Sequence, residues 1–225
     1  MFASRAAISA GDIERAHAAR EQVDRWLHVV DDPWLHARRE AMLGELARLE
    51  RRFDAAVAHI ARAAETSGRL GFLQTEAYQT TSLGRAQCQA GDYEAGAATL
   101  ALGIGKAEAT GDVRLAALGR VHLGRVLRAL GRDQEAREAL QRAADFHRAA
   151  GGGEQERLGD VLLAALDGDR ERLEAVLRAS AGDAPVEVFA LDALGRYEEA
   201  DARMADASHF IGDRDRTDRA RSRTP

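Results

Sequence analysis

The sequence predicts an all-α fold, an α/α superhelix (solenoid) of about six helix-turn-helix repeats. One observation is that turn positions recur at a single spacing, each 40 residues from the last: Gly11, Arg51, Gly91 and Gly131. Another is that the dipeptide Leu-Gly returns at the same spacing, at 43–44, 83–84 and 123–124. The third is a composition that favours helices, with 45% hydrophobic residues but only 5% aromatic residues and 3 prolines. A fixed period of this length is the signature of a repeat protein.

Each unit is expected to contain a helix, a tight turn, a second helix and a longer connection. The first hairpin begins with a short leading helix over Phe2–Ala10. In the third and fourth units the apolar residues follow the i, i+3, i+4 spacing of an amphipathic helix: Tyr93, Ala97, Leu100 and Ile104 in one, and Ala136, Leu140 and Ala143 in the other. Small residues at 44, 84 and 124 are expected to face small residues at 56, 96 and 136, so that paired helices approach closely.

The last two hairpins are expected to be shorter. Their turns fall at Gly168 and Gly195, closer together than the earlier period, and Pro185 suits the first turn of a helix. We therefore assign residues 1–209 to the repeat domain. Residues 210–225 form an Arg/Asp-rich tail with almost nothing apolar to bury, and we expect this tail to be disordered.

These segments resemble the tetratricopeptide repeat (TPR), which combines Leu-Gly in the first helix, a Gly-Asp/Arg-Tyr/Phe turn and an early alanine in the second helix. The best matches are Leu83-Gly84 with Gly91-Asp92-Tyr93, and Leu123-Gly124 with Gly131-Arg132 and Ala136; Leu43-Gly44 with Phe53 and Ala56 matches less fully. The usual unit has 34 residues. Units of about 40 residues resemble those in the sensor and scaffold regions of large bacterial transcriptional activators and related signalling ATPases. In one TPR subfamily, two sets of equivalent first-helix positions carry the lysines and asparagines of a carboxylate clamp. Here these positions hold Ala41, Thr81 and Val121 in one set and Glu45, Arg85 and Arg125 in the other. Chaperone-tail recognition is therefore not implied.

The resemblance implies a non-catalytic scaffold or adaptor, or the sensor domain of a bacterial regulatory protein, with a protein or peptide partner. The alternative is a receptor that holds a small signal molecule within the superhelix. No catalytic motif is present, and Gly103-Ile104-Gly105-Lys106 lacks the Ser/Thr of a phosphate loop. The 7 histidines are scattered over different units. We therefore expect no enzyme activity, no cofactor and no metal site.

The candidate binding surface is the concave face, which first helices line in solenoids of this type. Equal positions in successive units would stack into columns there, presenting guanidinium groups beside one aromatic ring. Such a groove suits carboxylates, phosphates or an acidic peptide. The alternative interpretation is that these arginines lie on solvated helix faces. The candidate residues are Arg38, Glu45, Arg48, Tyr78, Thr81, Arg85, Gln89, Arg125 and Arg128.

Two tryptophans, Trp26 and Trp34, bracket the junction of the first two units. Tryptophans placed in this way either fill a wide gap between repeats or form a partner hot spot. Both interpretations stay open at this point.

Charge and cysteine content limit the partner classes. The net charge of −5 and the pI near 5.8 argue against a duplex-DNA binder, so we expect no direct nucleic-acid contact. One cysteine, Cys88, cannot form an internal disulfide, and neither a signal peptide nor a membrane span is evident. We expect a cytoplasmic protein, and the sequence leaves a homo-oligomer open.

Overall fold

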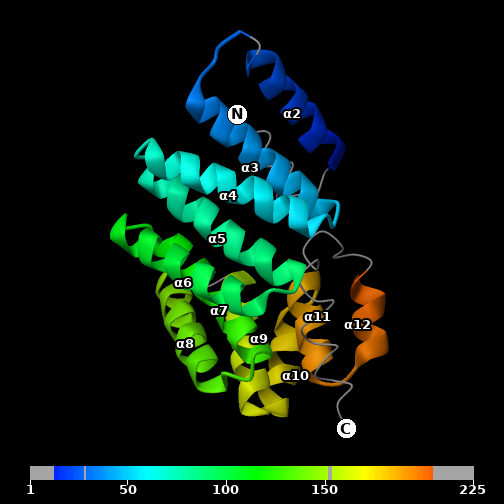
Figure 1. The fold of residues 1–225 in the computed structure, drawn as a ribbon. Coiled ribbons are helices and arrows are strands. Elements are labelled where there is room, and N and C mark those ends of the chain that lie inside the picture. The colour runs from blue at the N-terminus through cyan, green and yellow to red at the C-terminus, as the bar shows by residue number, and fades with distance from the viewer. Residues whose placement is uncertain (1–12, 28, 152–153, 205–225) are drawn as a thin grey trace. The chain divides into compact units, whose positions relative to one another are not determined.

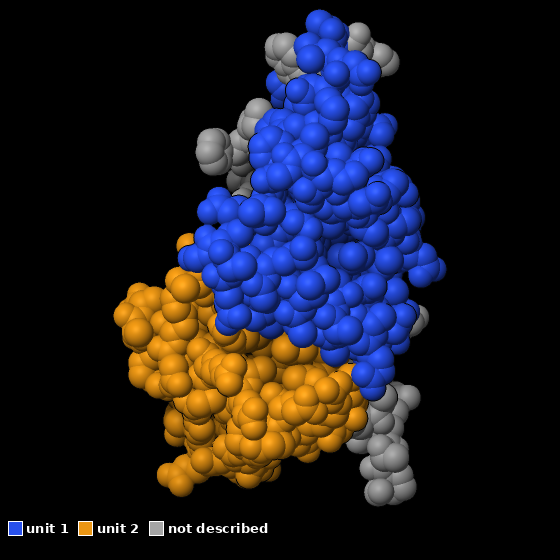
Figure 2. Space-filling model, turned by 60° about the vertical axis from the view of Figure 1, so that its left-hand side comes forward, with its two compact units in different colours: residues 1–112 blue, residues 113–225 orange. Residues whose placement is uncertain are grey.

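The computed structural model describes residues 13–27, 29–151 and 154–204. In these residues there are eleven helices and no strand (Figure 1), which confirms the all-α prediction. The chain divides into two compact units, Met1–Asp112 and Val113–Pro225 (Figure 2). The predicted extent of the repeat domain, 1–209, stays a prediction, and both the leading helix Phe2–Ala10 and the tail 210–225 lie outside the described residues.

The first unit contains α2 (Ile13–Leu27), α3 (Pro33–Leu49), α4 (Phe53–Arg69), α5 (Leu73–Ala90) and α6 (Tyr93–Ala109). The second contains α7 (Val113–Ala129), α8 (Asp133–Ala149), α9 (Glu154–Asp167), α10 (Arg170–Ala179), α11 (Ala184–Ala193) and α12 (Tyr197–Met204). Consecutive helices pack against one another within each unit. This arrangement is a series of helical hairpins, as the solenoid prediction requires.

The helices recur with a period of 20 residues, half the period seen in the sequence. Helices α3 to α8 each have 17 residues, except α5 with 18. The expectation of longer connections between hairpins was wrong for 70–72 and 110–112, which are as short as the turns 50–52 and 130–132. The extra residues relative to a 34-residue unit therefore lie in the helices. Left-handed backbone marks the end of every one of these helices, at Arg51, Gly71, Gly91, Gly111, Gly131 and Gly151.

The ends of α3 to α7 are each closed by the same pair of backbone hydrogen bonds. At the end of α7, the Gly131 N–H donates to the Arg128 carbonyl at 3.1 Å, and the Arg132 N–H donates to the Leu127 carbonyl at 2.9 Å. This is the Schellman arrangement, which needs a residue with positive φ and therefore favours glycine. Arg51, with φ of 61°, is the non-glycine residue that adopts this conformation among the described residues.

In the first unit, small residues let paired helices approach closely. A Cβ atom added to Gly84 on α5 would lie 2.8 Å from the Leu100 amide nitrogen and 3.0 Å from the Gly96 carbonyl oxygen, both on α6. Gly44 on α3 meets Ala56 and Ile60 on α4 in the same way. The predicted facing pairs 44/56 and 84/96 are confirmed. At the third position, Gly124, the nearest atoms belong to the Leu140 side chain instead of residue 136.

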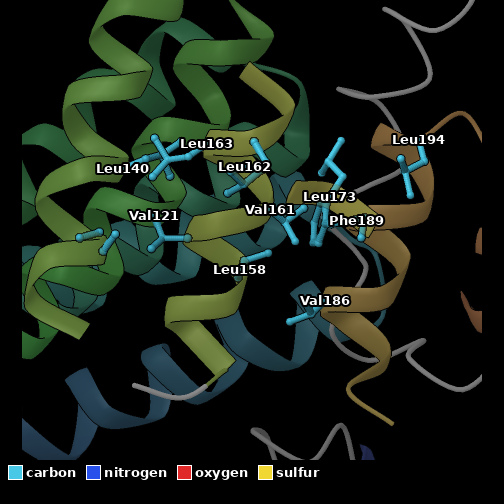
Figure 3. Packing of buried hydrophobic residues seen from close by; sticks show 14 residues of the cluster. Val121, Leu140, Leu158, Val161, Leu162, Leu163, Leu173, Val186, Phe189 and Leu194 are labelled. Atoms are coloured by element: carbon cyan, nitrogen blue, oxygen red, sulfur yellow. The ribbon is translucent and has the colours of Figure 1, made fainter. Parts of the chain in front are cut away.

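The second unit has a larger apolar core, formed by α7, α8, α9, α10 and α11 (Figure 3). Its buried residues include Val121, Leu140, Leu162, Leu173 and Phe189. The last two hairpins are shorter, as predicted, because α9 to α12 have only 14, 10, 10 and 8 residues. Their turns use positive-φ glycines at Gly168 and Gly195, and a proline occupies the start of α11.

Candidate functional site

Helix α5 carries an unusual row of buried polar residues. Within the described part of the first unit, five of the six buried polar side chains lie on this helix: Gln79, Thr80, Thr81, Ser82 and Gln89. Burying a polar group is unfavourable unless it forms a hydrogen bond. Two of the hydroxyls are satisfied locally, since Thr80 Oγ1 donates to the Glu76 carbonyl and Thr81 Oγ1 to the Ala77 carbonyl. Neighbouring parts of the protein therefore cover α5 on faces that carry polar side chains as well as on its apolar face.

Arg85 is the chemically most informative of the predicted residues. Its side chain is half-buried, and its Nε atom is buried with no hydrogen-bond acceptor among the residues that the structure describes. Leaving a buried donor unsatisfied costs about 1–3 kcal/mol, and more when the group is charged. Such a group calls for a specific explanation in a folded protein. One explanation that suits a guanidinium is that a bound partner supplies the acceptor.

Arg85 belongs to a polar stripe on α5 together with Tyr78, Ser82 and Gln89. These positions follow one another at intervals of four, three and four residues, which places them along one side of the helix. Tyr78 is half-buried, whereas Ser82 and Gln89 are buried. We call these four residues the α5 stripe. It brings a phenol, a hydroxyl, a guanidinium and an amide into one line.

Thr81 and Gln89 were predicted to face a partner, and the structure buries both of them. Thr81 is 3% exposed and lies against α6, where a Cβ on Gly103 would come within 2.6 Å of its hydroxyl. Its role in this chain is to pack α5 against α6. Gln89 is buried at the far end of the α5 stripe.

On α3, Glu45 and Arg48 pair with each other. The Arg48 Nε donates to Glu45 Oε2 at 2.8 Å, and both side chains are largely buried, at 13% and 12% exposure. An ion pair at i, i+3 is a local arrangement that helix geometry favours. Much of the charge that Arg48 was expected to offer a partner is therefore neutralised within its own helix.

Near the start of α3, Arg38 and Trp34 form a second small cluster. The Arg38 guanidinium carbon lies 5.0 Å from the Trp34 ring centroid, within cation–π range. The Trp34 ring also meets Phe72 edge to face, with centroids 6.3 Å apart. Trp26 lies on α2, and its side chain is outside the described residues. Of the two predicted tryptophans, the structure therefore describes the contacts of Trp34 alone. Its contact with Phe72 was not predicted from the sequence.

In the second unit, Arg125 is engaged by an aromatic ring. Its guanidinium carbon lies 4.7 Å from the centroid of Phe189 on α11, so the side chain helps to hold α7 near α11. Arg128 lies half-buried on the same helix and makes contacts of its own. The columns expected to join Arg125 and Arg128 to residues of the first unit stay a prediction.

A separate ionic cluster joins α3 to α4 around Glu40. His59 Nδ1 lies 2.9 Å from Glu40 Oε2, and the Arg62 Nε donates to the same oxygen at 2.7 Å. Burial by itself raises the pKa of Glu40, but the hydrogen bonds from His59 and Arg62 more than offset it and leave that pKa below its ordinary value. The cluster is structural in character, because its members satisfy one another.

No group of three or more His, Cys, Asp and Glu side chains among the described residues is arranged to hold a metal ion. No helix in that part of the chain is long and apolar enough to cross a membrane.

The fold defines the chain as a helical-repeat protein, built from α-helical hairpins that pack in sequence order. Among solved structures, this fold is similar to the crystal structure of a Rap protein complexed with competence and sporulation factor, with a TM-score of 0.65 and 14% sequence identity. The likeness covers 94% of this chain and 68% of that chain. At this identity it shows the fold alone. No protein-family model matches the sequence, and no curated protein matches it either.

Proposed function

We propose that this chain is an interaction scaffold that binds a segment of a partner protein along the α5 stripe of the first unit. The observation that carries the proposal is the buried Arg85 Nε, a charged donor for which the described part of the chain supplies no acceptor. A peptide carbonyl or a carboxylate is the acceptor that a guanidinium binds best. A partner segment carrying Asp or Glu is therefore the preferred ligand.

A neighbouring residue suits this kind of ligand. Tyr78, which is half-buried, places a phenol hydroxyl on the same side of α5, and such a group recognises peptide backbone. The solved neighbour supports the wider role, since it shows a protein of this fold complexed with a separate factor. On this basis we propose an adaptor or the sensor part of a regulatory protein, without enzyme activity.

The unliganded chain offers a first test. If Arg85 serves a partner and not the fold, Arg85→Met should leave the free energy of unfolding unchanged or raise it, because it removes a buried unsatisfied donor. Urea denaturation followed by circular dichroism measures this. A loss of more than about 1 kcal/mol would mean that Arg85 has a structural role in the free protein.

Binding supplies the second test. A displayed library of 12-residue peptides is panned on the purified chain, and selected peptides are measured by fluorescence anisotropy. We expect peptides that contain Asp or Glu, with affinity for Arg85→Met at least tenfold weaker. Arg142→Met, at an exposed arginine on α8, is the matched control and should bind as wild type. Peptides that bind all three proteins equally would contradict the proposal.

The small-ligand receptor is tested in the same experiment. If no peptide is selected, a thermal-shift screen of small carboxylates and phosphates on the wild type and on Arg85→Met follows. A compound that stabilises the wild type alone would favour the receptor and exclude the peptide scaffold.

A further inference from the structure

The first unit exposes a compact group of large apolar side chains at one end of its helices. Of the eight large hydrophobic side chains that are exposed in the described residues, five lie in the α2–α3 connection, in the α4–α5 turn or at the first residue of α5. We call these five the apolar edge. It consists of Val29, Val30, Leu70, Phe72 and Leu73.

Antiparallel packing brings these residues together. Helix α3 begins where α4 ends and α5 begins, so the α2–α3 connection and the α4–α5 turn lie at the same end of the unit (Figure 1). Trp34, at the start of α3, meets Phe72 in the α4–α5 turn, with ring centroids 6.3 Å apart. Val29 and Val30 come just before α3 in the chain and therefore lie at the same end of the unit.

The α4–α5 turn of this surface is held in a fixed shape. Gly71 adopts left-handed backbone with φ of 76°, and the Phe72 N–H donates to the Ser67 carbonyl at 3.0 Å. Helix α5 begins directly after Phe72. Because the backbone on both sides is hydrogen-bonded, a partner would meet a pre-organised surface and lose little conformational entropy in ordering it.

The turn itself does not require an aromatic residue at this place. The positions that follow the left-handed residue of the neighbouring helix ends are all polar: Arg52, Asp92, Asp112 and Arg132. Phe72 occupies the same position in the same hydrogen-bonded turn and is 44% exposed. The turn forms without a phenyl group in four other copies, so the turn does not require the ring at 72, which packs on Trp34 and stays partly exposed.

Beside the apolar edge, the cations Arg38, Arg69 and Lys106 balance the carboxylates of Asp31, Asp32 and Glu76, and Arg69 has no acidic partner among the described residues. Arg69 is exposed in the last turn of α4. Arg38 lies against the Trp34 ring. The nearby acids are already paired, since Asp31 Oδ1 lies 2.8 Å from His36 Nε2 and Glu76 Oε1 lies 2.6 Å from Lys106 Nζ.

We propose that the apolar edge is a second docking surface, which binds an acidic amphipathic segment of a partner protein. Apolar side chains of that segment cover Phe72, Leu73 and Leu70, and an Asp or Glu beside them pairs with Arg69. Aromatic residues and arginine dominate the binding energy of protein interfaces, and this surface presents both. The surface is separate from the α5 stripe, so each can be tested without the other.

The test uses the full chain and a displayed library of 16-residue peptides, panned at low salt and washed at moderate salt. We expect selected peptides to combine two or more large apolar residues with Asp or Glu. Phe72→Ser should weaken their binding at least tenfold and Arg69→Glu at least threefold. Arg85→Met should leave this binding unchanged, which separates it from the proposed function.

Leu102→Ser is the matched control, because Leu102 on α6 is 57% exposed, as Leu73 is, and lies outside the apolar edge. It should bind the selected peptides as wild type does. Circular dichroism and the urea midpoint establish that each variant is folded. Selection of basic peptides, equal affinity for Phe72→Ser and wild type, or the absence of any selected peptide would overturn the proposal. Concentration-dependent self-association that Phe72→Ser abolishes would also overturn it, because the occupant would then be a second copy of the chain.

Discussion

Replacing Gly84 by alanine should destabilise the first unit, although alanine is the better helix former. The added Cβ would lie 2.8 Å from the Leu100 amide nitrogen and 3.0 Å from the Gly96 carbonyl oxygen. Both atoms belong to the backbone of α6 and cannot rotate away, so α5 and α6 have to separate. Overpacking of this kind costs about 1–3 kcal/mol, while the change from glycine to alanine returns about 0.5–1 kcal/mol. We expect a net loss of roughly 1–2 kcal/mol from these two contributions.

Gly105→Ala is the matched control on the other helix of the same hairpin. Gly105 is interior to α6, and an added Cβ would meet nothing within 4 Å. This variant should gain about 0.5–1 kcal/mol, because only helix propensity changes. The two substitutions are chemically identical, so their opposite signs isolate the effect of helix–helix distance.

The assay is urea denaturation at 25 °C with circular dichroism, combined with hydrogen exchange of the α5 and α6 amides. Exchange is needed because the chain has two compact units and a single midpoint does not say which one has opened. A Gly84→Ala variant as stable as wild type would refute the reasoning. So would a Gly105→Ala variant that loses as much stability as Gly84→Ala.

Three further changes should shift stability in known directions. Arg51→Gly should raise the free energy of unfolding by about 1 kcal/mol, since Arg51 holds a φ of 61° that glycine adopts without strain; a lower urea midpoint would contradict this. Asp32→Ala should cost about 1 kcal/mol, because the Asp32 carboxylate accepts two backbone N–H groups at the start of α3, whereas Asp31→Ala, at a carboxylate that is 95% exposed, should cost less in the same measurement. Finally, because the pKa of Glu40 is lowered, its contribution to the free energy of unfolding is present above the unfolded-state pKa and is lost as pH falls through the folded-state pKa. Glu40→Gln should therefore reduce the fall of the urea midpoint at acidic pH. Parallel curves of urea midpoint against pH for the two proteins would exclude the effect.

Much of the fold could be predicted because single residues mark where its helices end. Gly91 and Gly131 stop helices through positive φ, and the apolar spacing around Leu100 and Leu140 identifies the buried face. The 20-residue recurrence of the helices was not predicted, because the connections between hairpins were expected to be longer than the turns within them. Glycines inside α6 were also ambiguous. On sequence alone Gly96, Gly103 and Gly105 all predict a weakened helix, but the structure gives the first two close neighbours on α5 and leaves only the third open.

The candidate site could be predicted only in part, because a period says which residues are equivalent and not what covers them. Thr81 and Gln89 stand at positions equivalent to groove residues, yet both are buried. Arg48 was assigned to a partner while Glu45, one turn earlier on the same helix, already pairs with it. The exposure of Phe72 depends on the packing of three helices. Its one signal in the sequence was the apolar run around Gly71, at a helix end where the other units carry polar residues.

The regular turns between helices, each with a left-handed residue, constrain how a chain of this kind can change in length. Helix direction alternates at every left-handed residue, so the loss or gain of one helix would reverse the course of everything after it. The loss or gain of two restores the course and leaves every turn intact. Unequal recombination between gene segments that encode Leu43-Gly44, Leu83-Gly84 and Leu123-Gly124 does this automatically, because it moves one whole hairpin at a time. Evolution can thus add or delete hairpins in this scaffold, and so alter how much surface it presents, while the geometry of each remaining hairpin is preserved.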